Sequence, residues 1–105
     1  MQAKNTHRFA ALEHNAEAAE ALLKQLANAK RLMIVCSLTG GERTVSELVD
    51  ITGLSHSAVS QHLAKMREAS IVSSVKRGQM VYYRICSMQA QTIVSVLYHM
   101  YCNKG

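Results

Sequence analysis

Two groups of residues in this 105-residue chain have the types and spacing to do chemistry, and the first is a polar run near its middle. Ser57, Ser60, Gln61 and Ala64 recur at helical spacing, with Lys65 beside them. Ser and Gln side chains can reach base edges or phosphates, and a face without bulky or acidic groups lets a helix enter the major groove. This face predicts a helix that reads DNA. A short helical hairpin with a solvated face is the alternative.

The second group consists of three cysteines, Cys36, Cys86 and Cys102, none of which belongs to a Cys-x-x-Cys motif. In a cytosolic protein a stable structural disulfide is not expected, so a cysteine pair would be a redox or metal device. Free cysteine is also common as a small buried apolar residue. The residue types alone leave both interpretations open.

The polar run lies in the second of two helices that the sequence predicts between Thr44 and Arg67. Thr44 and Glu47 form the S/T-x-x-E pattern of a capping box, which starts a helix that runs to about Thr52. Gly53 can adopt the left-handed conformation that ends it, and Ser55 is a suitable N-cap for the next helix. Two helices that meet at so tight a turn are typical of a helix-turn-helix.

On the second of these helices, Val59, Leu63 and Met66 recur at the spacing of a core-facing stripe. Before the pair, residues 15–29 predict an amphipathic helix, with Ala19, Leu22, Leu23 and Leu26 on one side. Lys30 to Leu38 is apolar nearly all round, as expected of a helix through the middle of a small domain. Residues 1–14 show no core pattern and are interpreted as an N-terminal arm, and 15–105 as a single domain.

After Met66 the pattern changes to that of a β-hairpin. Ile71 to Val75 and Met80 to Ile85 are rich in β-branched or aromatic residues, and a basic turn of residues 76–79 lies between them. Gly78 supplies positive φ in that turn. Two strands alone are marginally stable, so we expect the hairpin to pack on the helices and to project its basic tip toward the DNA backbone or minor groove. An ordinary solvated hairpin is the alternative.

The last predicted helix is capped by Ser87 and runs to about Asn103, with apolar residues on more than one face. A terminal helix of a small domain buries one face against its own core, so the other face needs a partner. We therefore expect a homodimer with this helix and the first helix at the interface. Two-fold symmetry would place two recognition helices on a pseudo-palindromic operator in double-stranded DNA.

Charge supports a nucleic-acid partner. The formal net charge is +5, and the segment from Leu54 to Cys86 contains five basic residues and one acidic residue. Positive charge beside the predicted recognition helix is what phosphate binding requires. No signal peptide or membrane-spanning run is visible, which predicts a cytoplasmic protein without a membrane partner. Without a Gly-rich phosphate loop or a nucleophile-base-acid set, the sequence does not favour an enzyme.

The predicted fold is mainly α with a β-hairpin wing, a winged helix-turn-helix in the order ααααββα. This order resembles the ArsR/SmtB family of bacterial repressors. The resemblance rests on Arg31-Leu32, on the run Ser55 to Ala69, and on Lys76 to Ile85, which ends like the family's wing. Ser70 stands where many members have glycine. The resemblance implies DNA contacts from the recognition helix and wing, namely Ser55, His56, Ser57, Ser60, Gln61, Lys65, Lys76, Arg77 and Gln79.

The resemblance also bears on the cysteines. The placement of one cysteine in the second helix and one in the terminal helix resembles that in the persulfide- and redox-responsive branch of the family. This resemblance implies that Cys36 and Cys102 form a sensing dithiol. Cys86 has no assigned counterpart there and is interpreted as structural. The inducer would be a low-molecular-weight persulfide or an oxidant, and no cofactor is implied. Passive cysteines are one alternative. Metal sensing is another, because His99 and Cys102 lie one turn apart and two subunits could supply four zinc ligands.

Overall fold

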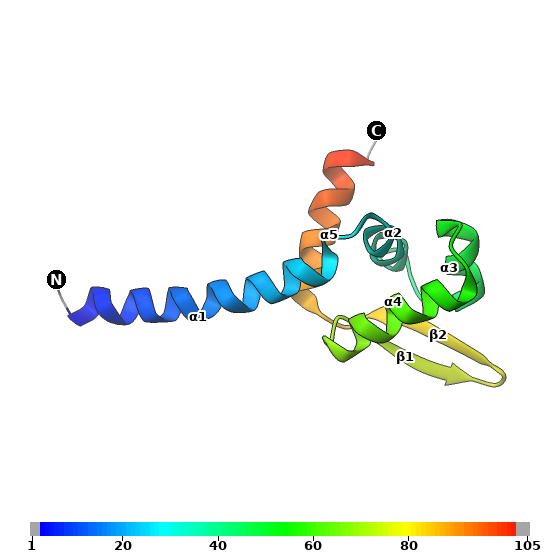
Figure 1. The fold of residues 1–105 in the computed structure, drawn as a ribbon, viewed down its shortest axis with the longest axis horizontal. Coiled ribbons are helices and arrows are strands. Elements are labelled where there is room, and N and C mark those ends of the chain that lie inside the picture. The colour runs from blue at the N-terminus through cyan, green and yellow to red at the C-terminus, as the bar shows by residue number, and fades with distance from the viewer. Residues whose placement is uncertain (1–2, 103–105) are drawn as a thin grey trace.

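The computed structural model describes residues 3–102, with side chains described from Phe9 onward. Its elements follow the predicted order and confirm the winged helix-turn-helix fold (Figure 1). No helix within this described part is long and apolar enough to cross a membrane. The bounds are α1 Ala3–Leu26, α2 Ala29–Leu38, α3 Val45–Thr52, α4 His56–Glu68, β1 Val72–Arg77, β2 Met80–Ile85 and α5 Met88–Tyr101.

The helix-turn-helix formed by α3 and α4 has the predicted caps. The Thr44 hydroxyl accepts a hydrogen bond from the Glu47 amide at 3.2 Å, and the Glu47 carboxylate accepts one from the Thr44 amide at 2.8 Å. Gly53 is left-handed with φ 73°, and the Ser55 hydroxyl caps α4 by accepting from the Ala58 amide at 3.1 Å. These local hydrogen bonds fix where α3 ends and α4 begins, and thereby the angle of the turn.

The core lies where α2, α3, α4 and α5 meet above the start of the hairpin. Val59, Leu63 and Met66 of α4 are completely buried, which confirms the predicted core stripe. The sequence of α2 suggested burial on all sides, but Met33 is 39% exposed and only one face of α2 lies in the core. Among the described residues, the core partners from the other elements are Leu26, Ile34, Val35, Leu38, Leu48, Ile71, Val72, Ala90 and Val94.

Helix α1 begins at Ala3, so the prediction that the first helix starts at Asn15 was wrong. No glycine or proline interrupts Ala3–Leu26, and its many Ala, Leu, Glu and Lys residues favour helix even without a core-facing pattern. The predicted end at Ala29 was also wrong, because Asn28 accepts the Arg31 amide and caps α2 instead. Residues 1–2 of the predicted arm lie outside the described range.

Most of α1 projects away from the rest of the domain (Figure 1). The radius of gyration is 16.6 Å, larger than the roughly 13 Å of a compact domain of this length. Leu26 is buried and Leu22 half-buried, whereas Leu23 is 50% exposed and Ala19 is exposed. The predicted apolar side of α1 is therefore covered only at its C-terminal end within one chain.

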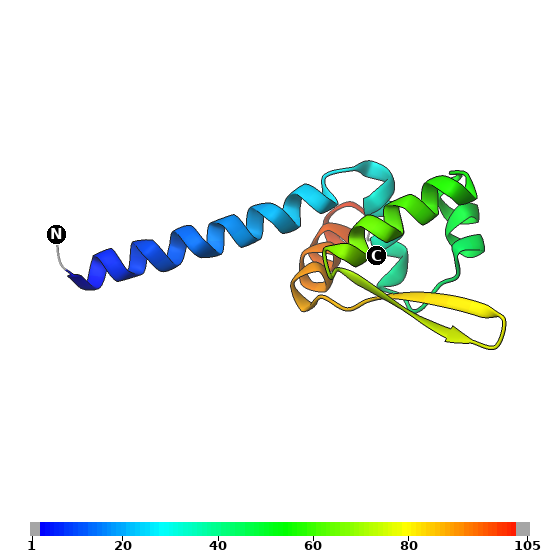
Figure 2. The ribbon, with the colours of Figure 1, turned by 60° about the horizontal axis from the view of Figure 1, so that its bottom comes forward.

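The hairpin is longer and its turn tighter than predicted. Arg77 pairs with Met80, so the strands continue to a two-residue turn at Gly78 and Gln79, where Gly78 has φ 62°. Residues 76 and 77 are thus the end of β1 and not part of the turn. Arg43 and Tyr83 exchange backbone hydrogen bonds of 3.0 and 2.8 Å, which fix β2 to the loop between α2 and α3. The hairpin extends beyond this bridge as the wing (Figure 2).

Ser70, between α4 and β1, is the one non-glycine residue in the described range with positive φ, at 61°. The left-handed conformation costs a non-glycine residue about 1–2 kcal/mol. It is maintained by two backbone hydrogen bonds, from Ser70 to Arg67 and from Ile71 to Met66. This geometry explains why glycine is suited to the position.

Helix α5 is capped as predicted, since the Ser87 hydroxyl accepts the Ala90 amide at 3.1 Å. The helix ends at Tyr101, two residues before the predicted Asn103, which lies outside the described range. Ala90 and Val94 face the core, whereas Val96 is 52% exposed and Tyr101 is 76% exposed. The helix therefore has one buried apolar face and one uncovered apolar face, as its sequence predicted.

Candidate nucleic-acid interface and thiol pair

The polar face of α4 is open to solvent. Opposite its buried stripe, all but one of the predicted DNA-binding residues at the start and on the face of α4 are exposed, and Ser60 is half-buried. The helix lies beside the hairpin (Figure 2). This arrangement gives a surface of short hydrogen-bonding side chains next to a basic strand pair. The exposed members are Ser55, His56, Ser57, Gln61 and Lys65.

Lys76, Arg77 and Gln79 of the wing are all exposed, and Arg77 also forms an ion pair within the domain. Its guanidinium donates two hydrogen bonds to the Glu42 carboxylate, at 2.5 and 3.2 Å, and lies 5.3 Å from the centre of the Tyr82 ring. Sequence reasoning missed Glu42, because 35 residues separate it from its partner and no local pattern connects them. The pair ties the wing to the loop before α3.

This ion pair leads to a test by titration. The Arg77 guanidinium holds the pKa of Glu42 below its ordinary value, first by hydrogen bonding and then by its charge, with a smaller effect from Arg84. The stabilisation is complete above the ordinary carboxylate pKa and is lost as the pH falls through the lowered one. Carbon NMR of the Glu42 carboxylate should show this lowered pKa, and Arg77→Gln should raise it to the ordinary range.

The matched control is Arg84→Gln, which removes the weaker charge and should raise the pKa of Glu42 only slightly. An unshifted Glu42 in the native protein, or equal effects of the two substitutions, would show that the pair does not form in solution.

His62, on α4 next to the core stripe, forms a hydrogen bond to another helix. Its Nδ1 accepts a hydrogen bond of 3.0 Å from Nε of Arg31. Burial lowers the pKa of His62, and the charges of Arg31 and Lys65 lower it further. The imidazole is therefore neutral at pH 7, with its proton on Nε2.

The thiol pair lies on α2 and α5. Cys36 is half-buried against the core and Cys102 is exposed at the end of α5, and both are free thiols. Burial raises the pKa of Cys36, and the neighbouring Cys102 raises it further. The two cysteines lie on helices that pack against each other, α2 and α5.

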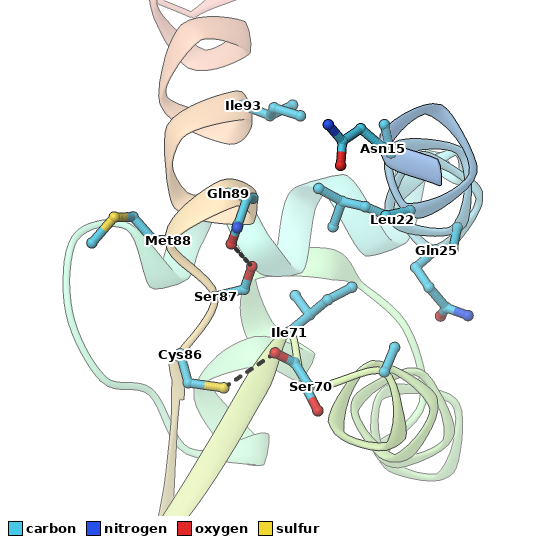
Figure 3. A pocket seen from close by; sticks show the side chains of 14 residues that line it. Asn15, Leu22, Gln25, Ser70, Ile71, Cys86, Ser87, Met88, Gln89 and Ile93 are labelled. Atoms are coloured by element: carbon cyan, nitrogen blue, oxygen red, sulfur yellow. Dashed lines mark hydrogen bonds between the residues drawn. The ribbon is translucent and has the colours of Figure 1, made fainter. Parts of the chain in front are cut away.

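Cys86 lies elsewhere, at the junction of β2 and α5. Its Sγ donates a hydrogen bond of 3.4 Å to the Ser70 carbonyl, and it lines an open hollow of 830 Å³ between α1 and the start of α5 (Figure 3). Leu22 and Ile93 face this hollow from the two helices. Cys86 thus lies at the opposite end of α5 from Cys102.

Within residues 3–102, no group of three or more histidine, cysteine, aspartate or glutamate side chains is placed to hold an ion. The zinc site considered in the sequence analysis would take its ligands, His99 and Cys102, from two subunits.

A helix-turn-helix with an exposed polar second helix, flanked by a basic hairpin, defines the class of winged helix-turn-helix DNA-binding proteins. Residues 28–74 match the family model described as "Bacterial regulatory protein, arsR family". Over 95 residues the chain is 44% identical to the transcriptional regulator YgaV of Escherichia coli K12, covering 90% of this chain and 96% of that protein. The chain belongs to the ArsR family, whose members are DNA-binding transcriptional regulators and not enzymes.

Solved structures agree with this assignment. Reduced HlyU from Vibrio cholerae superimposes with a TM-score of 0.84 at 39% identity, covering 88% of this chain and 97% of that one. The transcriptional repressor BigR from Xylella fastidiosa has a TM-score of 0.80 at 35% identity, covering 87% and 90% of the two chains. The whole domain, and not the helix-turn-helix alone, is therefore shared with these regulators.

Proposed function

We propose that this chain is a homodimeric repressor in the cytoplasm that leaves its operator when Cys36 and Cys102 are oxidised by a persulfide or another oxidant. The observation that supports this proposal is the packing of α2, which holds Cys36, against α5, which leads to Cys102. Burial raises the pKa of Cys36, and the charge of Cys102 raises it further. Similarity to the transcriptional repressor BigR and to the structure of reduced HlyU supports the same function.

The exposed Cys102 meets the inducer first, because Cys36 is half-buried and its raised pKa keeps it a thiol at neutral pH. The Cys102 thiolate attacks the outer sulfur of a persulfide RSSH, which forms Cys102–S–SH and releases RS⁻. The Cys36 thiolate, formed by loss of its proton to solvent, then attacks the inner sulfur. The Cys36–Cys102 disulfide forms and HS⁻ leaves, so two thiols are oxidised and RSSH is reduced to RSH and H₂S.

The dimer is proposed from the uncovered apolar faces of α1 and α5. A monomer rarely exposes so many large apolar side chains on two neighbouring helices. The hollow between these helices, visible in Figure 3, adds concave surface to the same region. A second copy of the chain would cover the apolar faces of both helices. The exposed side chains are Phe9, Leu12 and Leu23 on α1, and Met88, Val96, Tyr98, Met100 and Tyr101 on α5.

The same helices connect the thiols to DNA binding. A disulfide restricts its Cα atoms to about 4.4–6.8 Å, so closing the bond draws the end of α5 toward α2. Because α5 also contributes to the proposed dimer interface, its displacement alters the spacing of the two α4 helices. A dimer whose recognition helices no longer match successive major-groove segments loses its operator.

DNA binding through the wing is tested by salt dependence. Lys76→Ala removes an exposed positive charge, so affinity should fall for every DNA sequence, and the slope of log affinity against log salt should decrease by about one for each wing. Fluorescence anisotropy over a salt series measures both effects.

The matched control is Lys24→Ala, which removes a lysine whose side chain is 74% exposed on α1, away from the wing. It should leave the slope unchanged. Salt-independent binding, or an equal change of slope in the two variants, would exclude the wing as a phosphate contact.

A further inference from the structure

Arg31 connects three helices at one point. It is the third residue of α2, and its amide is fixed by the Asn28 cap at 3.0 Å. Its guanidinium donates from Nε to His62 of α4 at 3.0 Å, and from Nη1 to the Gln25 carbonyl and side-chain oxygen of α1 at 3.2 and 3.0 Å. A single rigid, planar group therefore holds the end of α1 against the middle of the recognition helix.

Few other contacts fix the direction of α1. Within the described part of this helix, Leu26 is its one buried side chain, and Leu22 and Gln25 are the half-buried ones. The Gln25 carbonyl belongs to the last turn, where helix carbonyls lack intrahelical partners and a positive charge is favourable. Arg31 satisfies that carbonyl and simultaneously binds α4. Loss of this contact would leave α1 held chiefly by its terminal leucines.

We propose that Arg31 and His62 are positioning residues for DNA recognition. While His62 is neutral, their hydrogen bond holds α4 at a fixed angle to α1, and when His62 is protonated the bond breaks and the angle is no longer fixed. This inference rests on the proposed function, because α1 contributes to the proposed dimer interface and its angle to α4 then sets the spacing of the two recognition helices. Neither residue needs to touch DNA for this role.

Protonation breaks the link for a simple chemical reason. The Nδ1 atom of His62 accepts from Arg31 only while it carries a lone pair, and the protonated ring places an N–H against the guanidinium N–H. Two positive groups would then stand at the 3.0 Å contact. The charged groups acting on His62 are Arg31 from α2 and Lys65 from its own helix, and α1 contributes the neutral Gln25 to the same guanidinium. No negative charge among these groups compensates the imidazolium.

The test uses the full-length reduced protein and follows operator affinity from about pH 8 to about pH 5 at constant ionic strength. Affinity of the native protein should be constant above the ordinary histidine pKa of about 6.5, and should fall by up to about tenfold per pH unit for each subunit below the lowered pKa of His62. The series is repeated in a His56→Asn background, so that the exposed imidazole at the start of α4 does not contribute to the measured change.

Two conservative substitutions separate positioning from folding. His62→Asn places an uncharged oxygen near the position of Nδ1, so it should keep affinity at neutral pH within about threefold and remove the acid-induced fall. Arg31→Lys keeps the charge but not the planar fork, so it should lose about tenfold at neutral pH with an unchanged dimer mass and helical content. An acid-induced fall in His62→Asn equal to that of the native protein, or an Arg31→Lys variant that binds normally, would overturn the proposal.

A readout without DNA distinguishes this inference from the proposed function. Residual dipolar couplings of backbone amides in α1 and α4 report the angle between the helices. The angle should change on acidification of the native protein, remain constant in His62→Asn, and be altered at neutral pH in Arg31→Lys. If the native protein bound no operator, the proposed function would fail, and an angle insensitive to both pH and Arg31→Lys would refute the positioning role independently.

Discussion

Cys36→Ser protein should remain on its operator after treatment with glutathione persulfide, whereas the native protein should lose about 5–150-fold in affinity. That range corresponds to the about 1–3 kcal/mol of coupling that is typical between a regulatory site and a binding site. The serine hydroxyl cannot attack the Cys102 persulfide, so the second step of the switch has no nucleophile. Anisotropy with a fluorescent operator, before and after treatment, measures the effect.

Cys86→Ser is the matched control, because Cys86 is an exposed thiol at the junction of β2 and α5, apart from the pair. It should be released like the native protein. Release of Cys36→Ser or of Cys102→Ser to the native extent would contradict the proposed dithiol. Equal resistance of all three variants would show that the response requires every cysteine and not a specific pair.

The largest effect on stability should come from Leu63→Ala. Leu63 is completely buried beneath α4, and truncating such a leucine costs about 2–5 kcal/mol through lost burial and a residual cavity. In a domain of this size each kcal/mol lowers the melting temperature by about 4–8 °C. Thermal and urea unfolding at a fixed protein concentration measure the loss, since dimerisation makes stability concentration-dependent.

Gln61→Ala, two residues earlier on the exposed face of the same helix, provides the comparison. It should change stability by no more than about 0.5 kcal/mol, while lowering operator affinity by about 1–3 kcal/mol if Gln61 contacts a base. The two substitutions thus separate the core side of α4 from its DNA side. Similar losses of stability in both variants would be inconsistent with the observed orientation of the helix.

The features that the sequence predicted best are those decided by neighbouring residues. The capping box of Thr44 and Glu47 needs only four consecutive residues, and the left-handed Gly53 and the Ser55 cap are equally local. The core stripe of α4 follows from helical periodicity. Local chemistry and periodicity were therefore sufficient for the helix-turn-helix, on which the family assignment also depends.

Predictions of helix and strand bounds failed where they relied on the absence of a pattern. Residues 3–14 lack a core-facing stripe, yet they continue α1 because nothing in them breaks a helix. The turn of the wing was expected to include its basic residues, but cross-strand pairing extends through Arg77. A hydrophobic pattern reports burial, and neither a projecting helix nor an exposed hairpin tip is buried.

The contacts that connect elements distant in the sequence could not be predicted. Arg77 pairs with Glu42 from 35 residues away, and Arg31 with His62 from 31 residues away. Each pair depends on the orientation of two elements, which no local signal encodes. The thiol pair of Cys36 and Cys102 was suggested by family resemblance alone, and the structure adds the packing of α2 against α5.

The most direct test of the thiol-switched repressor is one measurement on one sample: intact mass together with operator binding, first reduced and then treated with glutathione persulfide. The expected result is a loss of two hydrogens, or a gain of bridging sulfur, mapped by peptide analysis to Cys36 and Cys102 and accompanied by release from DNA. Operator binding that persists while both thiols are quantitatively linked would contradict the proposed switch.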